Sequence, residues 1–167
     1  MPKLIARPFH GRLPKKEKLR RSVELNLSEA DAVIALTDVY TGSNDFKDAE
    51  DAKRQMREWV GANPSFHAHV AQYDFEAWLL PYWDEIQKLS GSNRRAPGGH
   101  PESVDHNKPP SKWIEEIFRA GGRRDYIKPV VAARILESQD LTIAAQACPE
   151  LKAFLDTILG LCGCSSL

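Results

Sequence analysis

A strand, a helix and a second strand follow one another between residues 32 and 72, and this pattern constrains the fold more than any other feature. Residues 32–36 form a continuous apolar run, which is typical of a buried strand in a parallel sheet. Apolar residues then recur at the spacing of a helix face: Ala49, Ala52, Met56, Trp59 and Val60. Residues 66–72 again favour a strand. Because such a unit requires a right-handed crossover, the sequence predicts an α/β fold with a Rossmann-like parallel sheet flanked by helices.

The remainder of the chain is predicted to be mainly helical. Residues 75–89 carry a helical pattern that Pro81 should bend, and the many Gly and Pro residues of 90–110 indicate a long loop. Helices are also expected after residue 110, closed by Gly121 and Gly122, and at 129–137 and 149–159. The expected N-caps are Asn44 or Asp45 for the helix near residue 50, and Ser111 for the helix that follows the loop.

The size of the chain predicts one domain over residues 1–167. Its apolar runs are far shorter than the roughly 20 residues that span a bilayer, so no membrane association is expected. The cysteines are odd in number, and two of them lie in a Gly-Cys-Ser tail: Cys148, Cys162 and Cys164. Free thiols in a reducing compartment follow from this pattern, and we predict a cytoplasmic protein.

The N-terminal segment, residues 1–30, begins with a strongly basic arm. Residues 1–21 contain eight Lys and Arg residues against the single acid Glu17, a formal charge of +7 in a chain whose net charge is +0. Such an arm can bind the phosphates of a nucleic acid, because that contact releases counterions. The candidate contacts are Lys15, Lys16, Arg20 and Arg21. The alternative is a solvated basic surface without a partner.

Three carboxylates follow the predicted strands. Asp38 ends the first strand, and Asp74 and Glu76 follow the second by a few residues. Because ligands of parallel α/β sheets bind beyond the carboxyl ends of the strands, these side chains are candidate ligands for Mg²⁺, which prefers oxygen. An Asp or Glu at such a position can equally act as a helix cap or turn former.

His67 and His69 share one face of the second predicted strand, since side chains in a strand alternate. The pair can in principle hold a transition metal, but no Asp-His continuation follows, so half-exposed strand histidines are the alternative. The sequence also lacks a Gly-rich phosphate loop, a Gly-x-Ser-x-Gly elbow and an HExxH motif.

The motif Tyr-Asp-Phe-Glu-Ala-Trp-Leu-Leu at residues 73–80 is the most distinctive in the chain. Together with segments 33–40, 66–72, 126–128 and 147–155, it resembles a bacterial family known as domain of unknown function family 4276. That family is regarded as allied to the Toprim fold, the metal-binding α/β domain of topoisomerases, primases and certain nucleases. The resemblance implies a Toprim-like fold in which Asp38 and Glu76 are Mg²⁺ (or Mn²⁺) ligands and catalytic residues.

Two departures from the Toprim pattern bear on activity. Tyr40 stands where that pattern places a second aspartate, and the chain starts after the strand and helix that carry the opening Glu-Gly of the family. We therefore expect a sheet that is incomplete at the N-terminus and lacks one metal-binding carboxylate. Unpaired backbone groups at such an edge favour association with another chain, so homo-oligomerisation is a further expectation.

Two functions follow from the resemblance. The first is a Mg²⁺-dependent nuclease or phosphodiesterase of bacterial phage defence, with Asp38 and Glu76 as ligands, Asp74 as a further ligand and Lys128 as an electrostatic stabiliser. The second is a noncatalytic binding subunit that partners an ATPase or another protein. The feature that distinguishes the two functions is the opening glutamate of the family, because a protein without this metal-binding carboxylate is expected to be a weak catalyst or none.

Overall fold

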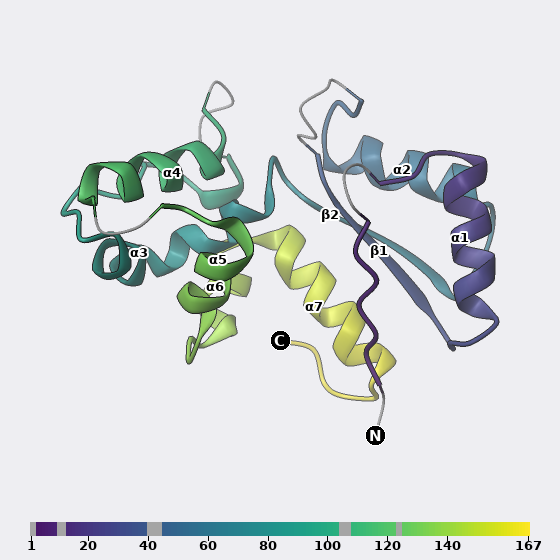
Figure 1. Ribbon diagram of the computed structural model, residues 1–167. Helices are drawn as coiled ribbons and strands as arrows, with labels where there is room; N and C mark the ends of the chain where they lie inside the picture. Colours follow the sequence, from purple (N-terminus) through teal and green to yellow (C-terminus); the bar gives the residue numbers. More distant parts are fainter. Residues whose placement is uncertain (1–2, 10–12, 40–44, 104–107, 123–124) are drawn as a thin grey trace. The chain divides into compact units, whose positions relative to one another are not determined.

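The computed structural model describes residues 3–9, 13–39, 45–103, 108–122 and 125–167 (Figure 1). The chain forms two compact units. Unit 1 comprises residues 1–70 and 153–167, and unit 2 comprises residues 71–152. The single domain predicted from length stays a prediction.

Unit 1 contains the predicted strand, helix and strand. Its elements, in chain order, are α1 (Glu17–Leu27), β1 (Val33–Asp38), α2 (Ala49–Val60) and β2 (Phe66–Ala71), followed much later by most of α7 (Pro149–Leu161). β1 and β2 pair in parallel as a two-stranded sheet, which confirms the α/β class (Figure 1). Among the described residues no third strand extends this sheet.

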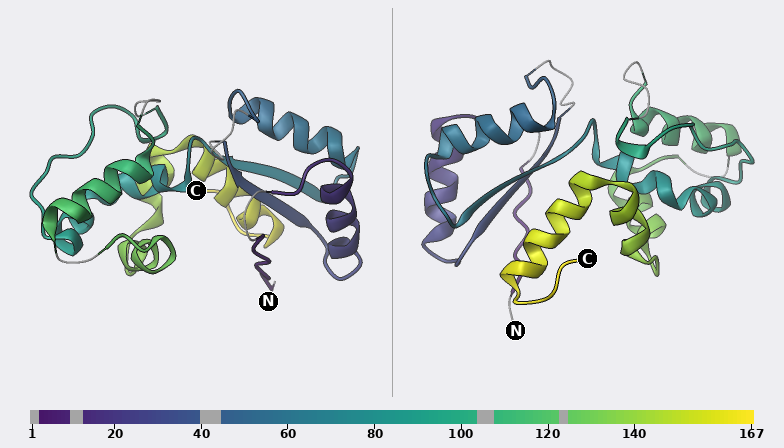
Figure 2. Two further views of the ribbon diagram at one scale, coloured as in Figure 1. Left: turned by 45° about the horizontal axis from the view of Figure 1, so that its top comes forward. Right: turned by 180° about the vertical axis from the view of Figure 1, so that it is seen from behind.

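The core of unit 1 lies between the sheet and the helices α1 and α2. These two helices lie on the same side of β1 and β2 (Figures 1 and 2). They bury Leu19 and Val23 from α1 and Ala52 and Met56 from α2, at 2% exposure or less. β2 adds side chains from one face: Phe66, Ala68 and Val70. Burying such a side chain contributes about 1.5 to 3 kcal/mol, so this layer holds the strands in register against α2.

The ends of α2 follow capping rules, although the predicted cap was wrong. Asp48 is the N-cap, and its side chain accepts a hydrogen bond from the Asp51 N–H at 2.8 Å. Asp45 lies outside the helix, and Asn44 is outside the described residues. Gly61 closes the helix with a φ of 88°, which an L side chain rarely adopts.

Unit 2 is helical, as predicted for the later part of the chain. Its elements are the 3-10 helix η1 (Phe75–Tyr82), α3 (Trp83–Ser90), the short η2 (Pro101–Ser103), α4 (Pro110–Gly121), α5 (Lys128–Leu136), α6 (Leu141–Ala147) and the start of α7. Pro81 lies inside η1, just before the helix changes from 3-10 to α geometry at Trp83. A proline removes a helical N–H donor, which accounts for this break.

The loop expected over residues 90–110 is present in its described part and is tied down by a buried acid. Glu102 is 7% exposed. Its carboxylate accepts hydrogen bonds from Trp78 Nε1 at 2.9 Å and from the Glu150 N–H at 3.1 Å. The second bond satisfies a free amide at the N-terminus of α7, where a negative charge is favourable.

None of the described helices is both long and apolar enough to cross a membrane.

Candidate functional site

Asp74 and Glu76 lie in a buried turn that follows β2. Tyr73 adopts a left-handed backbone conformation with a φ of 72°, which is uncommon for any residue other than glycine. Asp74 is then extended, and Glu76 falls in the first turn of η1. Asp74 is 4% exposed and Glu76 0%, so this segment places two acids in the interior of unit 2.

The Glu76 carboxylate is held by the residues that lead into α5. The Tyr126 hydroxyl donates a hydrogen bond to Glu76 Oε1 at 2.8 Å, and Lys128 Nζ lies 2.9 Å from Oε2. The same ammonium lies 4.9 Å from the centre of the Phe75 ring, a cation–π contact. A buried carboxylate is costly unless it is paired and hydrogen-bonded, so these contacts allow Glu76 to be buried.

Asp74 reaches the N-terminus of α4. The Ser111 N–H donates to Asp74 Oδ2 at 3.2 Å, and Ser111 is the second residue of that helix. Ser111 is therefore not the N-cap that the sequence predicted, since Pro109 occupies that position. Asp74 therefore accepts a hydrogen bond from one of the free backbone N–H groups at the start of α4, although it lies 37 residues earlier in the chain. Its other oxygen, Oδ1, is buried without a hydrogen-bond partner among the described residues.

Burial raises the cost of ionising both carboxylates. Burial raises the pKa of Asp74, and the Ser111 hydrogen bonds and the Lys128 charge oppose that shift. Burial and the neighbouring charge of Asp74 raise the pKa of Glu76, against the lowering effect of Lys128 and Tyr126. Burial and the Glu76 carboxylate raise the pKa of the Tyr126 hydroxyl, which keeps it a hydrogen-bond donor. The cluster therefore favours a bound cation or proton.

Asp38 belongs to the other unit. It is the last residue of β1 and is half-buried, whereas Asp74, Glu76 and Lys128 lie in unit 2. The predicted sharing of one cation by Asp38 and Glu76 stays a prediction. Within the described ranges, no three His, Cys, Asp or Glu side chains form a group that can hold a metal ion. Asp74 and Glu76 are thus a pair of candidate ligands and not a complete site.

Acidic neighbours compensate part of the charge of the basic arm. Lys15 Nζ lies 2.7 Å from Asp45, and Arg20 and Arg21 both pair with Glu17, at 2.9 and 3.2 Å. The two pairs with Glu17 are solvent-exposed, and the Asp45 side chain is half-buried. Exposed pairs each contribute at most about 1 kcal/mol, so Arg20 and Arg21 can exchange theirs for phosphate contacts. The role of these residues in binding nucleic acid stays a prediction.

Tyr126 was not predicted to have a role in the site. Its hydroxyl is the only hydrogen-bond donor to Glu76 Oε1 in the described part of the chain. The signal was present, since Tyr126 stands two residues before Lys128 in a segment that matches the family motif. What the sequence did not supply was the fold that brings this segment to Glu76.

These features define a mixed α/β protein with a buried carboxylate pair at the start of its second unit. The family model described as a domain of unknown function (DUF4276) matches residues 4–159. Because this match covers most of the chain, the protein belongs to that family, as its motifs predicted. No curated protein and no solved structure matches the chain.

Proposed function

We propose that the protein is a Toprim-like phosphodiesterase of the nuclease type that depends on Mg²⁺ or Mn²⁺. Its metal ligands are Glu76 and Asp74, with Asp38 as a further ligand from the end of β1. The observation that supports this proposal is the buried pair of acids, in which Asp74 Oδ1 has no hydrogen-bond partner among the described residues and burial raises both pKa values. A divalent cation would neutralise that pair.

The residues fit such a cation in chemistry. Carboxylate oxygens are the ligands that Mg²⁺ prefers, and the ion usually needs only one or two of them because it keeps several waters. When bound, the metal would activate water and stabilise the charge of a phosphodiester. Lys128 Nζ, close to Glu76 Oε2, would add a positive charge toward the same phosphate.

Calorimetric titration with Mg²⁺ and Mn²⁺ tests the ligand assignment. We expect Glu76→Gln and Asp74→Asn each to weaken metal binding on the order of 10- to 100-fold. Losing a residue that only hydrogen-bonds to a metal ligand already has an effect of this size, and losing the ligand itself should cost at least as much. Asp38→Asn should weaken it too if Asp38 contributes a third oxygen. Glu116→Gln is the matched control, since Glu116 is a partly exposed acid of α4 that pairs with Lys108.

Cleavage of single- and double-stranded DNA and RNA is measured with the same proteins. Divalent-dependent cleavage that Glu76→Gln abolishes and Glu116→Gln leaves intact supports the proposal. Unchanged metal binding in both Glu76→Gln and Asp74→Asn would remove this pair from the role of ligands.

A noncatalytic binding subunit is the second candidate. It is favoured by the full burial of Glu76 and by its contacts with Tyr126 and Lys128, which stabilise the fold without a metal. For this function we expect no cleavage, and a Glu76→Gln variant with altered stability but intact association with its partner, such as an ATPase. Copurification from the native source, followed by stability measurements, separates the two functions.

Replacing Lys15, Lys16, Arg20 and Arg21 by Ala is expected to flatten the salt dependence of nucleic-acid binding. Each phosphate contact contributes about 0.9 to the slope of log K against log salt, and three of these four residues already pair with acids. The slope should therefore fall by about 1 to 3. Fluorescence anisotropy at several salt concentrations measures it. A control with Lys88→Ala and Lys112→Ala should keep the wild-type slope, and an unchanged slope in the fourfold variant would make the arm a solvated surface.

A further inference from the structure

A cavity of about 220 Å³ lies in unit 1, between α2, β2 and the later part of α7. Its lining is rich in nitrogen: Lys53, Arg57, His67 and His69, with Thr157 and three apolar residues. No acidic side chain is among the described residues that line it, although Lys53 also pairs with Glu50 of α2. We name this cavity the β2 pocket. Its volume is several times the roughly 30 Å³ that one water molecule occupies.

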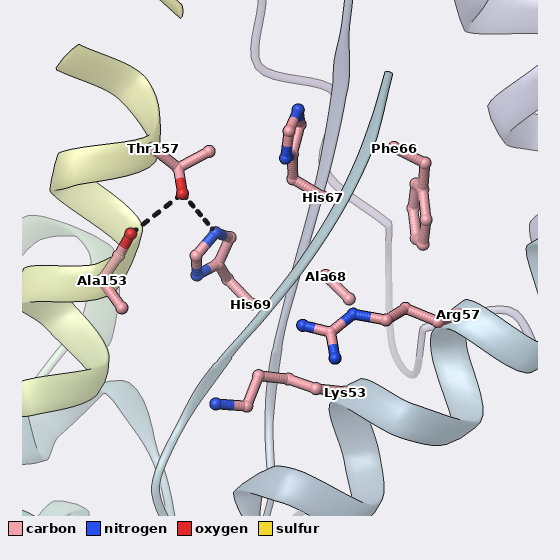
Figure 3. A pocket seen from close by; sticks show the side chains of 8 residues that line it. All are labelled: Lys53, Arg57, Phe66, His67, Ala68, His69, Ala153 and Thr157. Carbon is pink, nitrogen blue, oxygen red and sulfur yellow. Dashed lines mark hydrogen bonds between the residues drawn. The ribbon is translucent and has the colours of Figure 1, made fainter. Parts of the chain in front are cut away.

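The local fold explains the positive lining. Lys53 and Arg57 are four residues apart and share one side of α2, and both side chains extend toward β2 (Figure 3). His67 and His69 lie on the opposite face of β2 from the core residues Phe66 and Ala68, as strand alternation predicted, and point toward α7 (Figure 3). β1 is the only strand paired with β2 in the described ranges, so no other strand covers its second edge.

His69 is buried, at 8% exposure, and its hydrogen bonds define its tautomer. Thr157 Oγ1 donates its one proton to the Ala153 carbonyl at 3.0 Å. His69 Nε2, 3.0 Å from the same oxygen, must therefore donate its N–H to Thr157 (Figure 3). In neutral His69 this places the proton on Nε2 and leaves Nδ1 as a buried acceptor without a hydrogen-bond partner among the described residues.

The electrostatics of the pocket favour an anion over the metal ion that the two histidines first suggested. Burial lowers the pKa of His69 to about 4, and repulsion from His67, Lys53 and Arg57 adds to that effect. The positive charges of Lys53 and Arg57 oppose a metal cation just as they oppose an imidazolium. They favour an anion, and a tetrahedral phosphate has several oxygens for donors that converge from α2 and β2.

We propose that the β2 pocket binds a phosphate group, with Arg57 and Lys53 as its charged donors and His69 as a proton-coupled third donor. Burial is the main reason that His69 is neutral, and repulsion from His67, Lys53 and Arg57 adds to it. A bound phosphate would cancel that repulsion and attract an imidazolium, so we expect binding to be accompanied by proton uptake at Nδ1. The site is separate from the carboxylate pair Asp74 and Glu76, and does not depend on the activity proposed for it.

Phosphate binding is tested with inorganic phosphate and with short oligonucleotides that carry either a 5′-phosphate or a 5′-hydroxyl. We expect calorimetry to show saturable binding that strengthens as the pH falls from 7.5 to 5.5, with proton uptake seen as a dependence on buffer ionisation heat. Arg57→Gln should weaken binding on the order of tenfold, since hydrogen bonds to charged groups contribute about 1.5 to 3 kcal/mol. Arg54→Gln is the matched control, because Arg54 lies on the same helix and pairs with Asp51 and Glu58.

Nitrogen NMR of the imidazole gives a readout that does not depend on affinity. The free protein should show the Nε2–H tautomer of His69 at neutral pH, and saturating phosphate should shift its titration upward. His69→Gln should remove the part of the pH dependence and of the proton uptake that the titration of phosphate itself does not account for. Glu76→Gln should bind phosphate like the wild type. Preference for the 5′-phosphorylated oligonucleotide over its 5′-hydroxyl form identifies a nucleic-acid end as the source, and equal affinity for the two identifies a small phosphate.

Three results would overturn the proposal. They are equal weakening by Arg57→Gln and Arg54→Gln, an unshifted His69 titration at high phosphate, and binding of Zn²⁺ at His67 and His69 in place of phosphate.

Discussion

Gly121→Ala is expected to lower the free energy of unfolding by about 3 kcal/mol or more, because overpacking against rigid backbone has no cheap relief. Gly121 is the last residue of α4 and lies against the end of α3. A Cβ atom added there would stand 2.6 Å from the carbonyl carbon of Ser90 and closer still to its oxygen. Neither atom can move without shifting α3. Urea denaturation followed by circular dichroism measures the effect.

Two other glycines serve as controls for this result. Gly160→Ala in α7 meets no atom within 4 Å and should stabilise the helix by about 0.5 to 1 kcal/mol. Gly122→Ala also meets nothing, but its φ of 64° should cost about 1 kcal/mol. A Gly121→Ala variant that is no less stable than Gly122→Ala would mean that the two helix ends are farther apart than described.

Lys128→Met is expected to destabilise the protein by about 3 kcal/mol at pH 8, since it leaves the charge of Glu76 buried without its cation. Breaking a buried ion pair costs about 3 to 5 kcal/mol. The value expected here is at the lower end of that range, because Lys128 is partly exposed to solvent. The pKa of Glu76 is already raised by burial, and removing Lys128 raises it further. The folded variant then binds more protons than the unfolded chain. Its stability is thus retained below the ordinary carboxyl pKa of 4.5 and lost as the pH rises through the folded value.

Thermal unfolding between pH 4.5 and 8 measures this loss. The exposed pair of Lys112 and Glu115 supplies the control Lys112→Met, which should change stability by less than about 1 kcal/mol. The double variant Lys128→Met with Glu76→Gln should recover most of the loss, because the amide keeps an acceptor for Tyr126 without a charge. Added Mg²⁺ should also restore stability to Lys128→Met if the carboxylates bind a cation. A pH-independent loss would show that Lys128 acts through packing alone.

The sheet and α2 could be predicted because their signals are local. Residues 33–36 are uninterrupted apolar positions, and α2 repeats its buried residues at helical spacing. α1 was missed because its charged residues dominate the sequence, and only Leu19 and Val23 are fully buried. α6 was missed because seven residues carry too little periodicity to separate a helix from a loop.

The candidate site was predicted in its residues but not in its contacts. Asp74, Glu76 and Lys128 were named from motifs, whereas the capping of α4 by Asp74 and the bond from Tyr126 to Glu76 join segments 37 and 50 residues apart. The bond between His69 and Thr157 joins segments 88 residues apart. Such pairings depend on how the whole unit packs, and no local propensity encodes them.

The division of the chain has a consequence for its synthesis on the ribosome. Unit 2 is one continuous stretch, residues 71–152, and can acquire all of its contacts as soon as that stretch has emerged. Unit 1 includes residues 1–70 but is completed only by residues 153–167, so His69 has no Thr157 partner until that later stretch has been translated. At about 5 to 20 residues per second, the 88-residue interval leaves the nascent sheet without that helix for roughly 4 to 18 seconds. During this window the strand pair has an uncovered face, which makes the nascent chain a target for chaperones and for premature association.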